Sequence, residues 1–121
     1  MRIALAIWFV AHGVAHLPGF LVAWRLRNFS GLPFHTTVLA NRVDIGTAGM
    51  RLVGVGWLLA AVAFAALAVV TILRVEWWQE AAYAVLGFSM MLCVLGWPRA
   101  RIGVVANVVA VVVLLTAKRF G

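Results

Sequence analysis

The sequence predicts an all-α integral membrane protein, a four-helix antiparallel bundle in which residues 1–121 form a single transmembrane domain. Hydrophobic residues make up 66% of the 121 residues and charged residues only 11%, whereas a typical soluble domain has about 25% charged residues. A soluble protein of this size would have too few polar residues to cover its surface. The apolar residues also gather in four stretches, each close to the length that crosses a bilayer.

The predicted spans cover about residues 3–24, 52–73, 77–97 and 102–117, and the second could begin several residues earlier. Because backbone groups in lipid must be bonded internally, these spans must be helices. The connections after the second and third spans are short, which predicts antiparallel neighbours. The fourth span is short of the ~20 residues usually needed, and snorkelling by Arg101 and Lys118 can make up the difference.

The basic residues predict contact with lipid headgroups. The net charge is +7, but the cations form no stripe of the kind that binds nucleic acid. They lie mainly in pairs at the ends of the apolar stretches: Arg25 and Arg27, Arg99 and Arg101, Lys118 and Arg119. Such positions anchor helices at the membrane surface. The lipid bilayer is therefore the predicted partner, and the first apolar run, longer than the core of a signal peptide, is interpreted as a span.

The sequence lacks the motifs of the common soluble enzymes. Its single cysteine, Cys93, allows neither an intrachain disulfide nor a CxxC motif. Only three carboxylates are present, Asp44, Glu76 and Glu80, and no HExxH, P-loop, GxSxG or dinucleotide fingerprint occurs. We therefore predict no catalytic residues.

Two histidines in the first span are the main candidates for a functional site. His12 and His16 are four residues apart, so both rings project from one face of a helix. Ionisable groups inside a membrane span are costly and commonly functional. The alternative is that both are neutral and serve as hydrogen-bonding contacts between helices. In either case, we expect both rings to face the bundle interior. We also expect one ring to contact a polar atom on another helix, with Asn107 or the Arg42–Asp44 region as its partner.

The connection of residues 25–51 is too long to be structureless in so small a domain. We expect it to be ordered and to cap one end of the bundle. Arg42, Asp44 and Arg51 precede the second span and could contact an anion or polar headgroup at the mouth of the bundle, or simply form local ion pairs at the interface. Asn107, inside the fourth span, is expected to bond across the bundle. The predicted ligand-binding residues are thus His12, His16, Arg42, Asp44, Arg51 and Asn107.

The two histidines are too few for a metal site, which needs further ligands. The available additions are Cys93, Met90, Met91 and His35, and sulfur with imidazole would suit copper or haem. No sulfur lies at a spacing that demands such a site. We therefore predict no metal ligands and leave the cofactor open.

Two sequence motifs suggest a family. Residues 11–20 read Ala-His-Gly-Val-Ala-His-Leu-Pro-Gly-Phe, and Gly96-Trp97-Pro98 leads into Arg101-Ile102-Gly103. With its length and four spans, the chain resembles the small bacterial four-helix membrane proteins grouped around the DoxX-like families. The resemblance implies a bacterial inner-membrane protein that is associated with quinone-linked or other respiratory membrane complexes, or that has no assigned activity. The paired histidines depart from the usual glycine-rich first helix.

These observations favour a non-catalytic membrane protein. It would be an accessory subunit of a larger membrane complex, or bind a hydrophobic small molecule or lipid. Its partners would then be other membrane subunits or further copies of the chain. The alternative is a quinone- or haem-linked oxidoreductase component that uses His12 or His16. A small transporter is the second alternative, although transporters normally place an acidic residue deep in a span.

Overall fold

The computed structural model describes residues 2–27, 29 and 33–120, and this part of the chain is predominantly helical. Its helices are α1 (Arg2–Val14), α2 (Leu17–Ala23), α3 (Gly46–Ile72), α4 (Trp78–Leu95) and α5 (Arg101–Phe120). Two short strands, β1 (Thr37–Val38) and β2 (Val43–Asp44), lie in the connection between α2 and α3. The all-α prediction is confirmed, and the strands lie outside the helical rods.

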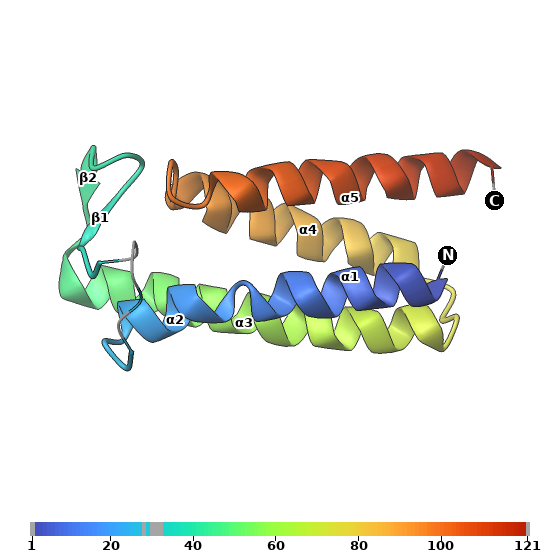
Figure 1. Ribbon diagram of the computed structural model, residues 1–121, viewed down its shortest axis with the longest axis horizontal. Helices are drawn as coiled ribbons and strands as arrows, with labels where there is room; N and C mark the ends of the chain where they lie inside the picture. The colour runs from blue at the N-terminus through green and yellow to red at the C-terminus, as the bar shows by residue number, and fades with distance from the viewer. Residues whose placement is uncertain (1, 28, 30–32, 121) are drawn as a thin grey trace.

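The helices run up and down in sequence order (Figure 1). α1 and α2 follow one another as a single rod, which packs along α3; α3 packs against α4, and α4 against α5. α1 and α5 are not among the helix pairs in extensive contact. The first and last rods therefore diverge, with α3 and α4 behind them.

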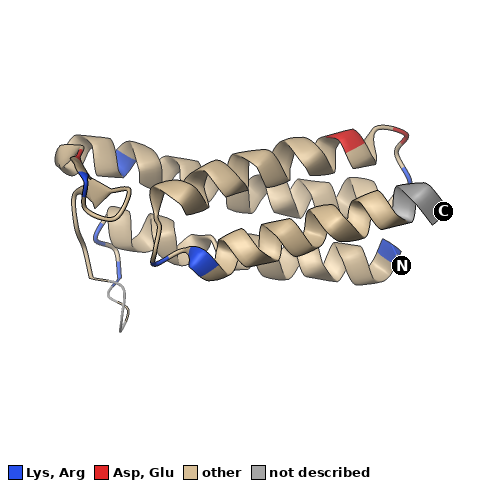
Figure 2. Cartoon of the chain, turned by 90° about the horizontal axis from the view of Figure 1, so that it is seen from above, with Lys and Arg blue, Asp and Glu red and all other residues tan. Residues whose placement is uncertain are grey.

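Three helical stretches are long and apolar enough to cross a membrane, which suggests a multi-pass membrane protein: Arg2–Ala23, Gly46–Ile72 and Trp78–Leu95. The predicted fourth span corresponds to a shorter apolar stretch, Arg101–Thr116; the side chain of Lys118 lies outside the described residues. Charged residues lie at the two ends of the rods and not along their middles (Figure 2). Apolar side chains such as Leu52 and Ile102 are largely exposed on the outside, as a lipid environment allows.

The first span is interrupted where the sequence predicts one continuous helix. Pro18 has no N–H, and its ring clashes with the carbonyl four residues earlier, so α1 ends at Val14 and α2 begins at Leu17. Across the break, the His16 N–H bonds to the Gly13 carbonyl at 3.0 Å and not to that of His12. The interruption therefore leaves the His12 carbonyl without its usual partner from the helix backbone.

α3 begins at Gly46, about six residues before the expected start. The Asp44 carboxylate accepts a hydrogen bond from the Gly46 N–H at 3.0 Å. The added turns pack against the end of α2: the Trp24 indole donates to the Arg51 carbonyl at 3.0 Å, and Gly54 lies against the Trp24 ring. Packing thus extends the helix beyond the purely apolar run.

The connection between α2 and α3 caps one end of the bundle, as expected from its length, although its residues 28 and 30–32 lie outside the described residues. β1 and β2 form an antiparallel hairpin that pairs Thr37 with Asp44. The Leu39 N–H donates to the Leu95 carbonyl at 2.9 Å, and the Ala40 N–H to the Trp97 carbonyl at 3.0 Å. These bonds fasten the hairpin to the end of α4.

The buried core is concentrated at the opposite half of the molecule. There, Leu5, Phe9, Phe64, Leu86 and Leu114 bring α1, α3, α4 and α5 together. A smaller cluster of Ala23, Val38 and Met50 lies under the hairpin. The larger core fills the half of the bundle away from the hairpin, which leaves the middle and the hairpin half to form a site.

The closeness of α1 and α3 gives a test of the packing. A Cβ at Gly13 would lie 2.8 Å from the Phe64 Cβ and 3.1 Å from the Ala61 carbonyl oxygen. We expect Gly13→Ala to lower the free energy of unfolding by about 1–3 kcal/mol, as overpacking typically does. A Cβ at Gly87 meets nothing within 4 Å, so Gly87→Ala should be neutral or stabilising because alanine favours helix. Unfolding of both variants in detergent measures this; equal effects would contradict the packing.

Candidate functional site

A cavity of about 460 Å³ lies where α1 and α2 diverge from α5. This volume is within the range of small-molecule sites, roughly 300–1,000 Å³. The side chains that surround it are mostly apolar. They come from α1 and α2 (Trp8, His12, His16, Val22), α3 (Met50, Val53, Trp57), the hairpin segment (Phe34, His35, Val38) and the α4–α5 region (Cys93, Arg99, Ile102, Ala106).

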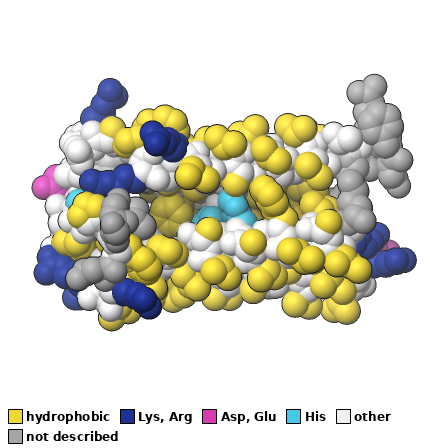
Figure 3. All heavy atoms as spheres, viewed as in Figure 1, with side chains coloured by type: hydrophobic (Ala, Val, Ile, Leu, Met, Phe, Trp, Pro, Cys, Tyr) yellow, Lys and Arg dark blue, Asp and Glu magenta, His cyan; other side chains and the backbone are white. Residues whose placement is uncertain are grey.

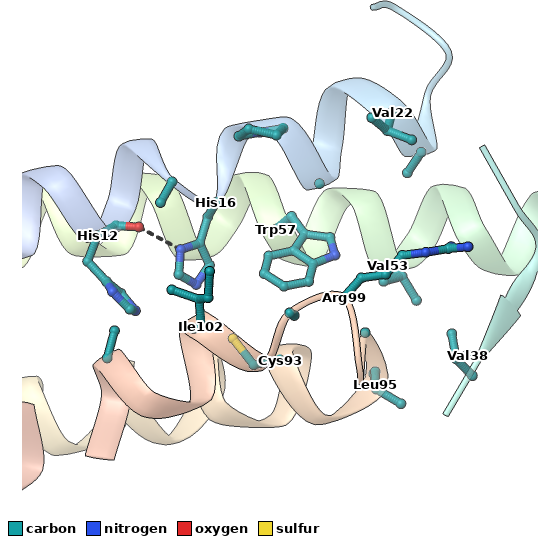
Figure 4. A pocket seen from close by; sticks show the side chains of 18 of the residues that line it. His12, His16, Val22, Val38, Val53, Trp57, Cys93, Leu95, Arg99 and Ile102 are labelled. Atoms are coloured by element: carbon teal, nitrogen blue, oxygen red, sulfur yellow. Dashed lines mark hydrogen bonds between the residues drawn. The ribbon is translucent and has the colours of Figure 1, made fainter. Parts of the chain in front are cut away.

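The cavity is open on the side of the bundle. Figure 3 shows it as a hollow between two ridges of apolar side chains, with histidine at its base. In the close view of Figure 4, Trp57 lies between His16 and Arg99. The cavity thus has a polar inner end at the histidines, an apolar middle, and a cationic outer end below the hairpin.

The protonation pattern of His16 follows from its contacts. Its Nδ1 lies 2.7 Å from the His12 carbonyl oxygen, which can only accept a hydrogen bond, so Nδ1 carries the hydrogen (Figure 4). In a neutral ring Nε2 is then an acceptor. Ser89 Oγ lies 2.6 Å from that Nε2, so the hydroxyl of Ser89 donates to it.

This arrangement fixes the groups around Ser89. Since the one hydroxyl hydrogen of Ser89 is committed to His16, Asn107 must present its amide hydrogens, and its Nδ2 donates to Ser89 Oγ at 3.0 Å. The same Nδ2 lies 3.7 Å from Cys93 Sγ. His12 Nε2 is 3.4 Å from Ser89 Oγ, a contact that attracts only if Nε2 carries a hydrogen. We call His12, His16, Ser89 and Asn107 the polar cluster.

The polar cluster is enclosed by protein. His12 is 7% exposed, and Ser89 and Asn107 are fully buried. The His12 ring meets the Phe64 ring edge-on at 4.7 Å between centroids, and the His16 ring lies 5.1 Å from that of Trp57. The expectations that both imidazoles face the interior and that Asn107 bonds across the bundle are therefore confirmed. The residue on another helix that bonds to the rings is Ser89, which was not the expected partner. Their role in binding a ligand stays a prediction.

The other predicted site residues lie away from the polar cluster. Arg42 and Asp44 are exposed on the hairpin, and the Gly46 N–H, followed by the Thr36 side chain, lowers the pKa of Asp44. Arg51 is exposed at the start of α3, with its guanidinium 5.2 Å from the Trp24 ring centroid. None of the three borders the cavity. Other residues of the connection between α2 and α3 border the cavity: Phe34 and His35, which precede the hairpin, and Val38 of β1.

Three residues of the site were not selected from the sequence. Ser89 joins both histidines to Asn107, Trp57 lines the apolar middle, and Arg99 lies at the outer end. A signal was present for the first two: Ser89 interrupts an apolar run, and Trp57 lies inside a span and not at its border. Arg99 resembles any interfacial cation in the sequence.

His35 connects the hairpin to the outer end of the cavity. Its Nδ1–H donates to the Thr37 carbonyl at 2.8 Å. Partial burial, and secondly the charge of Arg99, lower the pKa of His35 below 6.5. Arg99 thus provides positive charge at this end while His35 is neutral at pH 7.

Metal ligation is limited by the spacing of the side chains. Within residues 2–27, 29 and 33–120, no three His, Cys, Asp or Glu side chains lie close enough together to hold a metal ion. Cys93, one of the ligands considered from the sequence, is buried and contacts the Asn107 amide.

The chain matches no protein-family model, and searches of curated proteins and of solved structures gave no match. The resemblance to DoxX-like proteins therefore remains an expectation from sequence motifs.

The polar cluster should contribute to stability through Ser89. Ser89→Ala leaves His16 Nε2 without its donor and Asn107 Nδ2 without its acceptor, so we expect a loss of about 1–2 kcal/mol, the range found for such bonds between isolated helices. Thr71→Val is the matched control, because Thr71 is also fully buried but its hydroxyl donates within its own helix, to the Leu67 carbonyl. The free energy of unfolding should decrease less in Thr71→Val than in Ser89→Ala. Reversible unfolding in detergent provides the comparison, and a greater loss in Thr71→Val would argue against the cluster.

His35 should make stability depend on pH. Because its folded pKa lies below 6.5, the unfolded chain binds more protons once the pH falls below 6.5, and stability decreases there. His35→Gln should therefore lose less of its Tm than the wild type between pH 7.5 and pH 5. Thermal unfolding at both pH values measures the difference. An identical decrease in Tm for the two proteins would show that neither burial nor the charge of Arg99 lowers the pKa of His35.

Proposed function

We propose that this protein is a multi-pass protein of the bacterial inner membrane whose four-helix bundle binds a hydrophobic small molecule or lipid without chemically changing it. In this proposal α5 is the fourth crossing. Its apolar part, Arg101–Thr116, is about 24 Å long at 1.5 Å per residue, and Arg101 can reach the headgroups from its end.

The observation that carries the proposal is the position of the cavity. It lies between the two rods that diverge, α1–α2 and α5, and opens on the apolar side of the molecule. A molecule dissolved in the bilayer could enter from the side without crossing the headgroup layer. The apolar walls suit a hydrocarbon body, and a few polar groups at one end are typical of sites that orient a ligand.

The chemistry of the site favours binding over catalysis. The hydrogens of Ser89, Asn107 and His16 are used in contacts within the cluster. The carboxylates of the chain are distant from the middle of the rods: Asp44 is in the hairpin, Glu76 is in the connection before α4, and Glu80 is in the first turn of α4. The same placement disfavours a proton-linked transporter, which normally needs a buried acidic group.

A quinone- or haem-linked oxidoreductase component is the second candidate, because His12 and His16 both border the cavity. Ring nitrogens at such a site could contact a quinone oxygen or a haem iron. An absorbance spectrum of the purified protein tests the haem version: a Soret band would support it, and a spectrum of protein alone would remove it. An accessory-subunit role would be supported by a stoichiometric partner chain in co-purification.

A brominated lipophile tests binding directly, because bromine quenches tryptophan fluorescence on contact and Trp57 borders the cavity. Titrating 12-bromododecyl methyl ether into the protein in lipid nanodiscs should quench fluorescence saturably. Ala106→Phe, which places a ring in the cavity, should remove the saturable part. Val109→Phe adds the same ring to the exposed face of α5, and saturable quenching should be retained in this variant. Quenching that rises only with bilayer content, alike in all three proteins, would contradict the proposed site.

A further inference from the structure

We propose that the ligand of this cavity carries a hydroxyl group: it is a lipid-soluble alcohol or phenol that donates a hydrogen bond to His12 at the inner end. This inference deepens the proposed function and rests on it. It rests on the hydrogens and lone pairs of the polar cluster that the contacts within the protein leave unused.

The donors of the cluster are committed. His16 Nδ1–H donates to the His12 carbonyl, and the Ser89 hydroxyl donates to His16 Nε2. Asn107 Nδ2 donates to Ser89 Oγ and lies near Cys93 Sγ. His12 Nε2 lies 3.4 Å from Ser89 Oγ, a contact that is attractive when this nitrogen carries the ring hydrogen, and we assign the hydrogen to it on that ground. Each hydrogen in the cluster thus has an acceptor inside the protein.

What remains in the cluster is acceptor capacity. With Nε2 of His12 protonated, its Nδ1 carries a free lone pair, and the bonds of the described residues leave that atom available. The side-chain oxygen of Asn107 is buried and has no hydrogen-bond partner among the described residues. Leaving a buried acceptor unbonded costs free energy. Of these two acceptors, His12 is the one that borders the cavity, so an occupant that brings a hydrogen can serve it.

The positions of the two residues decide which acceptor an occupant would meet. The His12 ring borders the cavity, whereas Asn107 lies behind it on α5, next to the cavity residue Ala106. A hydroxyl at the inner end would therefore meet His12 first. The body of the ligand would extend past Trp57 through the apolar middle. A ketone, ester or ether would present only an acceptor to a cluster that already has acceptors to spare.

Matched probes test the hydrogen requirement. The 12-bromododecan-1-ol and its methyl ether share the same chain and bromine, but only the alcohol can donate. Both are titrated into the protein in nanodiscs, and affinities are expressed per mole fraction of probe in the bilayer. We expect the alcohol to bind about tenfold more tightly, which is the effect of one good hydrogen bond.

Variants assign the preference to His12. His12→Phe keeps a ring but removes the acceptor, so the alcohol should bind only as well as the ether. Val14→Phe adds a ring to the exposed side of the same helix and should retain the tenfold preference. A preference that survives His12→Phe would overturn the assignment. If His12→Phe does not fold, the comparison of the two probes in the wild type still decides the hydrogen requirement.

The remaining outcomes separate this inference from the proposed function. Equal, saturable affinities for alcohol and ether in the wild type would overturn the hydroxyl requirement while leaving the cavity as a binding site. Equal affinities are also expected if a water molecule occupies the free acceptors, so that result counts against the inference as well. An absence of saturable quenching by either probe would overturn the proposed function together with the inference.

Discussion

The hydrogen bond from the His16 ring to the His12 carbonyl is the contact on which the arrangement of the site depends. It exists because Pro18 interrupts the first span, so that the His16 backbone N–H bonds to Gly13 and the His12 carbonyl needs another donor. The His16 side chain supplies that donor. This choice sets which nitrogen of His16 accepts, which way the Ser89 hydroxyl points, and which end of the Asn107 amide faces Ser89. Through this hydrogen bond, Pro18 sets which atoms donate and which accept in four buried side chains on three rods.

The same rod also explains why a cavity accompanies the polar cluster. Gly13 allows α1 to lie directly against Phe64 of α3, so the first rod follows α3 and not α5. The hairpin is fastened to the end of α4 by backbone bonds from Leu39 and Ala40, and the apolar core closes the far half. Both ends are therefore closed, and the space between the diverging rods remains open at the side.

Much of the fold could be predicted because its cause is local. Long apolar stretches, Pro98 and cations at the ends of the rods are visible in the sequence, as is the pairing of His12 and His16 on one face. The start of α3 and the docking of the hairpin depend on contacts between distant residues, such as the Trp24 indole on the Arg51 carbonyl, and no local pattern encodes them. Asn107 was identified by its position in a span. Ser89 and Trp57 carried a similar signal and Arg99 carried none, and their contacts with the site arise only when distant parts of the chain come together.

The tautomers of the histidines test this account most directly. Nitrogen NMR of the protein in bilayers, with ¹⁵N-labelled histidine and resonances assigned through single His→Phe variants, reports which ring nitrogen of each residue carries hydrogen at pH 7.5. The account predicts hydrogen on Nδ1 of His16, whose partner is the His12 carbonyl, and on Nε2 of His12, which faces Ser89. Hydrogen on Nε2 of His16 would contradict it, because the Ser89 hydroxyl would then be turned around and the cluster would no longer be left with acceptors.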